Sequence, residues 1–285
     1  MYAFNSCREA VHHCIEEKTF SVAYLFREEK TMQPHVHDCC ELYYSIAGGK
    51  KFLIGEHCYD VRPGDLFAIS QYETHYLKQV DTMTHERIVF SIYPAFLKSL
   101  SSPQTDLTAC FRHSGKDWTN RLHLDRNGQK RFVYYAHKIT NADGFGNDLL
   151  ARAALTELLV MINRKYAESR PETPDQGYRY NQTVADLIHY LNRHITEPLT
   201  LDSLSAHFFM SKSYLCRIFK AETGTTVKKY LTARRISIAK VLLAEGHSVS
   251  EACEQSGFND YVNFVKSFTK LVGIPPKRYS LGCAS

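Results

Sequence analysis

Three histidines and a glutamate form a pattern early in the chain whose side chains could bind a ligand. His35, His37 and Glu41 follow one another in the string HVHDCCE, and His75 comes after the turn Pro63-Gly64-Asp65. Imidazole and carboxylate groups suit Zn, Fe, Mn or Ni. The same polar groups, placed among aromatic side chains, would also suit a pocket for an organic effector. The residue types therefore leave a metal, an organic ligand and an empty pocket open.

The distribution of charge along the chain indicates a second kind of chemistry. From residue 178 to the end the chain has 14 Lys and Arg against 8 Asp and Glu, whereas the preceding part has 21 against 22. Because lysine and arginine near a phosphate backbone release condensed counterions, this asymmetry suits a nucleic-acid partner. A solvated basic face would have the same composition, so the charge alone does not decide.

The residues from Thr200 to Gly224 predict two short helices joined by a tight turn. Thr200 and Ser211 are predicted N-caps, and Gly224 is a predicted C-cap. In the second helix Leu215 and Phe219 face inward at helical spacing, which leaves a basic outer face. Such a pair can enter a major groove about 12 Å wide. A plain helical hairpin has the same pattern, so this unit alone leaves both interpretations open.

The helix-pair pattern recurs further along the chain. A short helix over 249–256 and a second helix over 260–271 form the second unit, and a longer helix over about 227–245 lies between the units. The second helix is predicted to face inward with Phe264, Phe268 and Leu271. Two such helices fixed by one connecting helix can enter successive major grooves about 34 Å apart. The repeat therefore favours DNA recognition.

Short β segments precede these helices and must position the histidine cluster. They are rich in Val, Ile, Tyr and Phe, and turn signals such as Gly48-Gly49 separate them. The expected strands are Ser21–Phe26, Glu41–Ile46, Lys51–Ile54, His57–Val61, Asp65–Ile69, His75–Gln79 and Glu86–Ile92. Many short strands at near-regular spacing predict a sandwich or barrel.

The apolar spacing changes to a helical period after Pro94. Helices are expected over 132–140 and 149–166, and the second has an apolar stripe. The stripe consists of Leu150, Ala154, Leu158, Met161 and Ile162. It could pack on its own domain, form a dimer interface, or do both.

The segment from Leu199 to Tyr279 resembles the AraC-type family of transcription regulators. The resemblance rests on SKSYLCRIFKAETG (211–224), ARRISIAKVLL (233–243), GFNDYVNFVKSFTK (257–270) and GIPPKRY (273–279). It implies base and phosphate contacts from the exposed faces of two recognition helices. The matching positions are Ser211, Lys212, Ser213, Cys216, Arg217 and Lys220 in the first unit, and Tyr261, Val262, Asn263 and Lys266 in the second.

Arg217 is expected to read a base, since guanidinium can pair bidentately with guanine O6 and N7. Ser211, Lys212 and Lys220 are expected to contact phosphates. Lys266 stands where the family usually has arginine, which favours phosphate contact there over bidentate readout. Cys216 offers only a weak donor.

Residues 20–93 resemble the cupin barrel that serves as the sensor domain of AraC-type regulators. The pattern HxHx3Ex6G followed by PGDx9H carries the resemblance. It implies an effector pocket lined by Tyr24, His35, His37, Glu41, Tyr43 and His75. In enzyme cupins the residues matching His35, His37, Glu41 and His75 bind a divalent metal. For a regulator of this kind we expect no required cofactor. A divalent metal bound by these four residues is the alternative to an organic effector.

The expected fold is multidomain, with an N-terminal cupin-like β-barrel plus helices and a C-terminal all-α module with two helix-turn-helix units. The expected domains are an effector-binding domain (1–100), a helical extension that could dimerise (101–168), a linker (169–180) and a DNA-binding domain (181–285). No run approaches the ~18 apolar residues of a membrane span. The nine cysteines are scattered without a CxxC motif, which favours reduced thiols in a cytoplasmic protein.

The leading hypothesis is a transcription regulator, an activator by family resemblance, controlled by a small-molecule effector. Its expected partners are promoter DNA, a second copy of the chain and RNA polymerase, with no membrane and no enzymatic activity. The first alternative is a metal-dependent cupin enzyme fused to a DNA-binding module. The second is a constitutive DNA-binding protein with a vestigial sensor.

Overall fold

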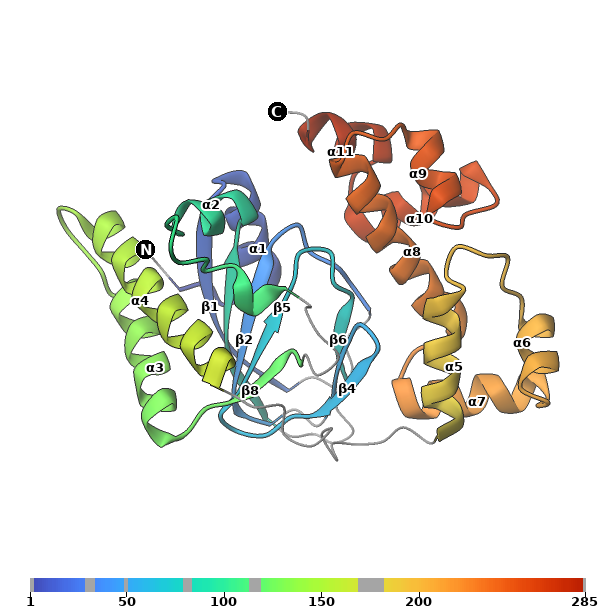
Figure 1. The fold of residues 1–285 in the computed structure, drawn as a ribbon, viewed down its shortest axis with the longest axis horizontal. Coiled ribbons are helices and arrows are strands. Elements are labelled where there is room, and N and C mark those ends of the chain that lie inside the picture. The colour runs from blue at the N-terminus through green and yellow to red at the C-terminus, as the bar shows by residue number, and fades with distance from the viewer. Residues whose placement is uncertain are drawn as a thin grey trace.

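A computed structural model describes residues 3–28, 34–48, 51–78, 84–112, 119–168 and 182–283. A sheet-rich domain and a helical domain lie side by side, with a long helix of the second facing the sheets of the first (Figure 1). The predicted linker, 169–180, lies outside the described residues. No helix in the described ranges is long and apolar enough to cross a membrane. No disulfide joins the cysteines whose side chains are described.

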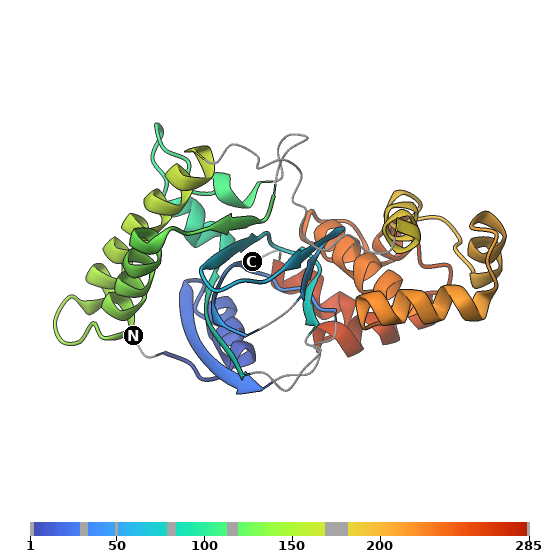
Figure 2. The same cartoon turned by 90° about the horizontal axis from the view of Figure 1, so that it is seen from below.

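The sheet-rich domain consists of two antiparallel sheets. The five-stranded sheet has the order β1 (Phe20–Glu28), β7 (Thr84–Ile92), β2 (Cys40–Ala47), β5 (Asp65–Ile69) and β8 (Arg121–His123). The three-stranded sheet has the order β4 (His57–Asp60), β3 (Lys51–Ile54) and β6 (His75–Lys78). The sheets curve around a shared interior (Figure 2), but no named strand of one is hydrogen-bonded to a strand of the other in the described ranges. The predicted barrel is therefore a two-sheet sandwich.

Side chains along each strand alternate between the two faces of the sheet, so they pack into two separate cores. Tyr43 and Val89 face inward, where they join Phe52 and Phe67 between the sheets. Their neighbours in sequence face outward, where Tyr44 stacks near Phe132 with ring centroids 4.5 Å apart. Helices α3 (Arg126–Thr140) and α4 (Asn147–Glu168) cover this outer face (Figure 1).

Smaller elements complete the domain. Helix α1 (Cys7–Glu16) packs on β1, and its buried Ala10 joins the core between the sheets. Helix α2 (Pro94–Ser99) and the short 3-10 helix Ala109–Phe111 follow β7.

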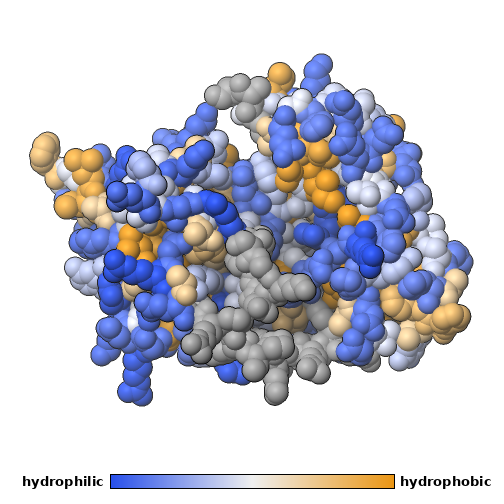
Figure 3. All heavy atoms as spheres, in the orientation of Figure 1, coloured by the Kyte–Doolittle hydropathy of each residue, from blue (hydrophilic) through white to orange (hydrophobic). Residues whose placement is uncertain are grey.

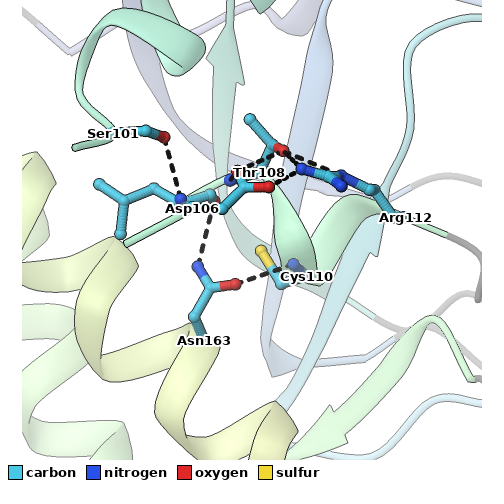
Figure 4. A network of polar contacts seen from close by, with 7 residues as sticks. Ser101, Asp106, Thr108, Cys110, Arg112 and Asn163 are labelled. Carbon is cyan, nitrogen blue, oxygen red and sulfur yellow. Dashed lines mark hydrogen bonds and ion pairs between the residues drawn. The ribbon is translucent and has the colours of Figure 1, made fainter. Parts of the chain in front are cut away.

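The segment that runs from the end of α2 through the 3-10 helix is held against α4 by a polar network (Figure 4). The Asn163 side chain on α4 accepts a hydrogen bond from the Cys110 amide, at 2.8 Å, and donates to the Leu107 carbonyl. Arg112 pairs with Asp106. One side chain of α4 thereby holds the irregular segment against the helix.

The predicted stripe on α4 packs mostly on its own domain. Ala154, Leu158, Met161 and Ile162 are buried in the outer core, whereas Leu150 is 54% exposed. Leu150 belongs to an exposed apolar end of the helix pair together with Phe145 and Leu149, visible as orange spheres at the far end of the sheet-rich domain (Figure 3). Dimerisation through the 149–166 helix stays a prediction.

The helical domain contains seven helices in its described range. They are α5 (Gln182–Arg193), α6 (Leu201–His207), α7 (Lys212–Thr223), α8 (Val227–Ala244), α9 (Val249–Gln255), α10 (Tyr261–Val272) and α11 (Pro276–Cys283). The pairs α6–α7 and α9–α10 are the two helix-turn-helix units, and α8 connects them (Figure 1).

Local caps define the boundaries of these helices. The Thr200 and Ser211 side chains accept hydrogen bonds from backbone amides of the first turns of α6 and α7, as predicted. Gly224 and Gly273 end α7 and α10 in the left-handed conformation, which glycine adopts without strain. One prediction on α10 is wrong: Leu271 is 42% exposed, because Phe264 and Phe268 fill the inward side, with Val265 and Val272 packed beside them.

Candidate functional site

The outer face of α7 presents the residues predicted to contact DNA. Leu215 and Phe219 are buried one turn apart and fix the rotation of the helix. Five of the six predicted positions are exposed and the sixth is half-buried: Ser211, Lys212, Ser213, Arg217 and Lys220, with Cys216 less accessible.

Several of these side chains already have partners within the domain. The Ser211 hydroxyl accepts a hydrogen bond from the Tyr214 amide at 3.3 Å, so one of its two lone pairs is used for capping. Lys212 forms an ion pair with Asp202 on α6. The Arg217 guanidinium lies over the Tyr214 ring, 5.4 Å from its centroid. Stacking of this kind limits the directions in which the guanidinium projects.

Helix α10 exposes the second set of predicted contacts. Tyr261, Val262, Asn263 and Lys266 are all exposed, on the side opposite the buried Phe264 and Phe268. Asp260 caps the helix by accepting from the Asn263 amide at 2.6 Å. The first three of these side chains therefore lie in the first turn, the part of a recognition helix that reaches base edges.

Contacts near α8 set the position of the two units relative to each other. Arg235 donates from Nε to the Ile195 carbonyl, at 2.8 Å, and from a terminal nitrogen to the Glu197 carbonyl, at 2.7 Å. Gly257, in the turn of the second unit, lies so close to this segment that a Cβ would approach the Thr196 Cα to 2.7 Å. The sequence reasoning missed both roles, since only the folded chain brings residues 195–197 to these positions.

The structure brings the three predicted histidines and Glu41 together between the two sheets. His35 and His37 lie before β2, Glu41 lies on β2 and His75 begins β6. The three rings contact one another with centroid separations of 4.5 to 5.0 Å. The Glu41 carboxylate lies 3.4 Å from His37 Nε2 and 3.9 Å from His75 Nε2.

Burial controls the protonation of this cluster. Burial, with a smaller contribution from His35, lowers the pKa of His75 to about 3. Burial raises the pKa of Glu41 to about 7, against the opposing effect of Arg87. Burial, followed by the neighbouring charges, also lowers the pKa of His37 well below its usual value. His37 and His75 are therefore neutral near pH 7, the form that binds metals.

The cavity at the cluster is small. It measures about 20 Å³ and is lined by Cys7, His35, Glu41, Tyr43 and His75, among others. The prediction that Tyr24 lines this pocket is wrong. Tyr24 pairs with Ile88 on the outer face of the sheet and packs near His137 of α3, because alternation along β1 turns it away from the interior.

A larger hollow lies elsewhere in the domain. A groove of about 460 Å³ runs between α3 and α4 and includes Arg131, Tyr135 and Arg164 in its lining. None of the predicted effector residues lines it.

The residue after His37 connects the sheet-rich domain to the DNA-binding domain. The Asp38 carboxylate lies 2.9 Å from the Lys240 ammonium on α8 and accepts a hydrogen bond from the Tyr279 hydroxyl. Lys240 also lies 5.3 Å from the ring centroids of Tyr72 and Tyr279. We call Asp38, Tyr72, Lys240 and Tyr279 the interdomain lock. No sequence pattern indicated it, because its members are far apart in the chain.

Other contacts extend the interdomain interface. The Tyr230 hydroxyl on α8 donates to the Gly55 carbonyl at 3.2 Å, and Ser237 donates to the Tyr72 carbonyl. Lys78 on β6 donates to the Ala221 and Glu222 carbonyls, at the end of α7. The first recognition helix is thus in direct contact with the sheet-rich domain.

Comparison with known proteins gives matches to both the sheet-rich domain and the helical domain. Residues 22–159 match the family model described as an AraC-like ligand binding domain, and residues 204–281 match a helix-turn-helix domain. The HTH-type transcriptional activator RhaR of Salmonella schwarzengrund (strain CVM19633) is 26% identical over 268 residues, covering 93% of this chain and 92% of that protein.

Two solved structures are also similar. ToxT from Vibrio cholerae matches with 14% identity and a TM-score of 0.39, over 93% of this chain and 98% of that one. The C-terminal domain of AraT, a response regulator from Geobacillus stearothermophilus, matches with 28% identity and a TM-score of 0.35, over 36% of this chain and 88% of that one. With a ligand-binding model and a helix-turn-helix model matched in the order that the structure shows, the chain belongs to the AraC family of transcription regulators.

Proposed function

We propose that the chain activates transcription from promoters with two short sequence elements about one helical turn of DNA apart. The observation that supports this most directly is the pair of exposed, N-capped helices α7 and α10, attached to one connecting helix. An effector bound in the sheet-rich domain controls the activity by shifting the population of DNA-competent arrangements. The activator assignment draws on the relative named as a transcriptional activator.

The remaining partners and the compartment belong to the same proposal. A homodimer that contacts RNA polymerase in the cytoplasm would fit a promoter-bound activator. The exposed end formed by Phe145, Leu149 and Leu150 supports the dimer, because apolar side chains grouped at a surface favour association.

The alternative, a cupin enzyme fused to a DNA-binding module, is disfavoured by the size of the interior. A cavity of about 20 Å³ at the histidine cluster leaves no room for an organic substrate. We therefore propose that the chain has no enzymatic activity. Turnover of a small molecule that is lost in His75→Ala would contradict this.

The first test is selection of bound sequences from a random DNA pool with the purified full chain at a stated salt concentration. We expect an enriched site with two elements about 10 base pairs apart. A single enriched element would mean that only one helix-turn-helix unit reads bases. No enrichment, with and without added divalent metal, would contradict the proposed function.

Arg217→Ala and Lys220→Ala should separate base reading from phosphate contact on the same helix. Arg217→Ala should weaken binding to the selected site by about 1–3 kcal/mol and relax preference at one base pair. Lys220→Ala should weaken binding to all sequences alike and reduce the dependence of affinity on salt. Both are measured by titration of the selected and a scrambled duplex. If both variants lost the same affinity on the selected duplex as on the scrambled duplex, the prediction that Arg217 reads a base would be wrong.

A further inference from the structure

The groove between α3 and α4 has room for an organic molecule. Its volume of about 460 Å³ lies within the range of pockets that bind small organic ligands, about 300–1,000 Å³, whereas the cavity at the histidine cluster measures about 20 Å³. The two helices lie side by side on the outer face of the five-stranded sheet (Figure 1). The groove is therefore separate from the interior, where the sequence pattern predicted the effector pocket.

Two arginine side chains that line the groove have no carboxylate partner in the described part of the chain. Arg131 on α3 donates to the Tyr135 hydroxyl at 3.5 Å and forms no ion pair there. Arg164 on α4 forms neither an ion pair nor a side-chain hydrogen bond with any described residue. A guanidinium presents paired N–H donors that match the two oxygens of a carboxylate or phosphate group. Two such donors at one groove therefore indicate a ligand with an acidic group.

The other charged residues of the lining do not cancel these two arginines. Lys165 Nζ lies 2.9 Å from the Asp125 carboxylate, and the Glu157 carboxylate lies 4.0 Å from Lys138 Nζ. Glu168, at the end of α4, is the one lining carboxylate without an ion pair among the described residues. Two unpaired arginines against one unpaired carboxylate leave the groove with a net positive charge, which favours an anion over a cation.

Three further lining side chains offer an apolar surface. Tyr135 and Met161 are 7% and 5% exposed, and the partly buried Val160 packs against the same outer core. Burial of a hydrocarbon or aromatic group against these side chains would be favourable, because it removes apolar area from water. The groove thus combines donors for an acidic group with a surface for an apolar body.

We propose that the α3–α4 groove binds a small organic acid and that this acid is the effector. Arg131 and Arg164 hold its carboxylate or phosphate group, and its apolar body packs on Val160 and Met161. The effector role rests on the proposed function, whereas the binding of an organic acid does not.

The position of the groove along the chain supports the effector role. Arg164, Lys165 and Glu168 belong to the end of α4, and all three line the groove. Helix α4 is the last element of the sheet-rich domain before the chain continues to the DNA-binding domain. A ligand held by these residues restrains the end of the helix to which the DNA-binding domain is joined, and so shifts the population of domain arrangements.

Binding is tested with the full chain and three probes that share a phenyl body: phenylacetate, phenyl phosphate and the neutral phenylacetamide. In calorimetric titrations at least one of the two acids should bind saturably at one site per chain, and phenylacetamide should bind at least about tenfold more weakly. A response to phenylacetate alone indicates a carboxylate effector, and a response to phenyl phosphate alone indicates a phosphate ester. Absence of saturable binding by both acids, or equal binding of the neutral probe, would overturn the inference.

Substitutions of the arginines distinguish a built site from a solvated basic surface. Arg131→Gln and Arg164→Gln should each weaken binding of the acid by about tenfold, since each removes a charged hydrogen-bond donor. Both side chains are exposed, so the melting temperature should stay close to that of the wild type. Arg126→Gln changes an exposed arginine of α3 outside the lining and should bind the acid as the wild type does. The same affinity in all three variants would mean that the groove does not hold the acid.

The effector role is tested on the DNA sequence selected above, with the acid that binds. Saturating acid should change the affinity of the wild-type chain for this duplex by about tenfold, within the usual range of coupling between two sites. Arg164→Gln should lose most of that change at the same concentration of acid. Binding of the acid without any change in DNA affinity would overturn the effector role alone. Specific DNA binding by a chain that binds neither acid would overturn the inference and leave the proposed function standing.

Discussion

Gly257→Ala should destabilise the DNA-binding domain by about 3–4 kcal/mol, whereas Gly273→Ala should cost about 1 kcal/mol. Both glycines have a positive φ, +86° and +91°, so an alanine is strained at either position. The two positions differ in how much space there is for an added Cβ. A Cβ at Gly257 would lie 2.7 Å from the Thr196 Cα and 2.8 Å from the Ile195 carbonyl oxygen, whereas nothing lies within 4 Å of a Cβ at Gly273.

The clash at Gly257 also has a functional consequence. Backbone atoms cannot rotate away as a side chain can, so the segment 195–197 or the turn of the second unit must move. That segment is the one that Arg235 holds against α8. The two recognition helices should therefore change their relative position, and Gly257→Ala should lose more affinity for a duplex with both elements than for a duplex with one.

Denaturant unfolding of the two variants and titration of the two duplexes measure these effects. Gly246→Ala is a second control, with φ +92° and open space around the Cβ. Equal destabilisation at Gly257 and Gly273 would show that the close approach between the two units does not exist in solution.

Local signals made the helix-turn-helix units predictable. The caps Thr200, Ser211 and Gly224, together with the i, i+4 spacing of Leu215 and Phe219, depend only on residues within a turn or two of one another. The same holds for many of the strands, since turn signals such as Gly48-Gly49 and Pro63-Gly64-Asp65 separate neighbouring segments. Strand β8 was missed, because its three residues, Arg121–His123, are too few to show an alternation.

Features that depend on distant parts of the chain could not be predicted. The face on which Tyr24 lies depends on the register of β1 against β7, and the exposure of Leu271 depends on how far the core around Phe268 extends. The histidine pattern predicted a ligand site, but how close its side chains lie and the small volume of the cavity beside them required the folded structure. The interdomain lock joins Asp38 to Lys240 and Tyr279, which no local pattern could relate.

Lys240→Met should lower the stability of the docked chain by about 3 kcal/mol, the low end of the cost of breaking a buried ion pair. Lys240 is only 2% exposed, and its ammonium is held by Asp38 and by the faces of two tyrosine rings. The low end applies because the Asp38 side chain is 23% exposed and keeps partial contact with water. Lys228→Met, an exposed lysine on the same helix, should change stability by less than about 0.5 kcal/mol.

The cause of the loss can be separated by a double-mutant cycle. Much of the cost of Lys240→Met comes from leaving the Asp38 carboxylate without its cation, so Asp38→Asn combined with Lys240→Met should recover part of the stability.

The backbone conformation of Tyr72 makes the interdomain lock sensitive to the loss of a contact. Its φ of +63° lies in the left-handed region, which costs a non-glycine residue about 1–2 kcal/mol and persists only where surrounding contacts impose it. Loss of Lys240 removes one of those contacts, so the segment around Tyr72 and His37 should relax and the domains should separate more readily. The measurement is the denaturant midpoint of the first unfolding transition, together with the radius of gyration in solution. Additive effects of the two substitutions and an unchanged radius would mean that Asp38 and Lys240 do not hold the domains together.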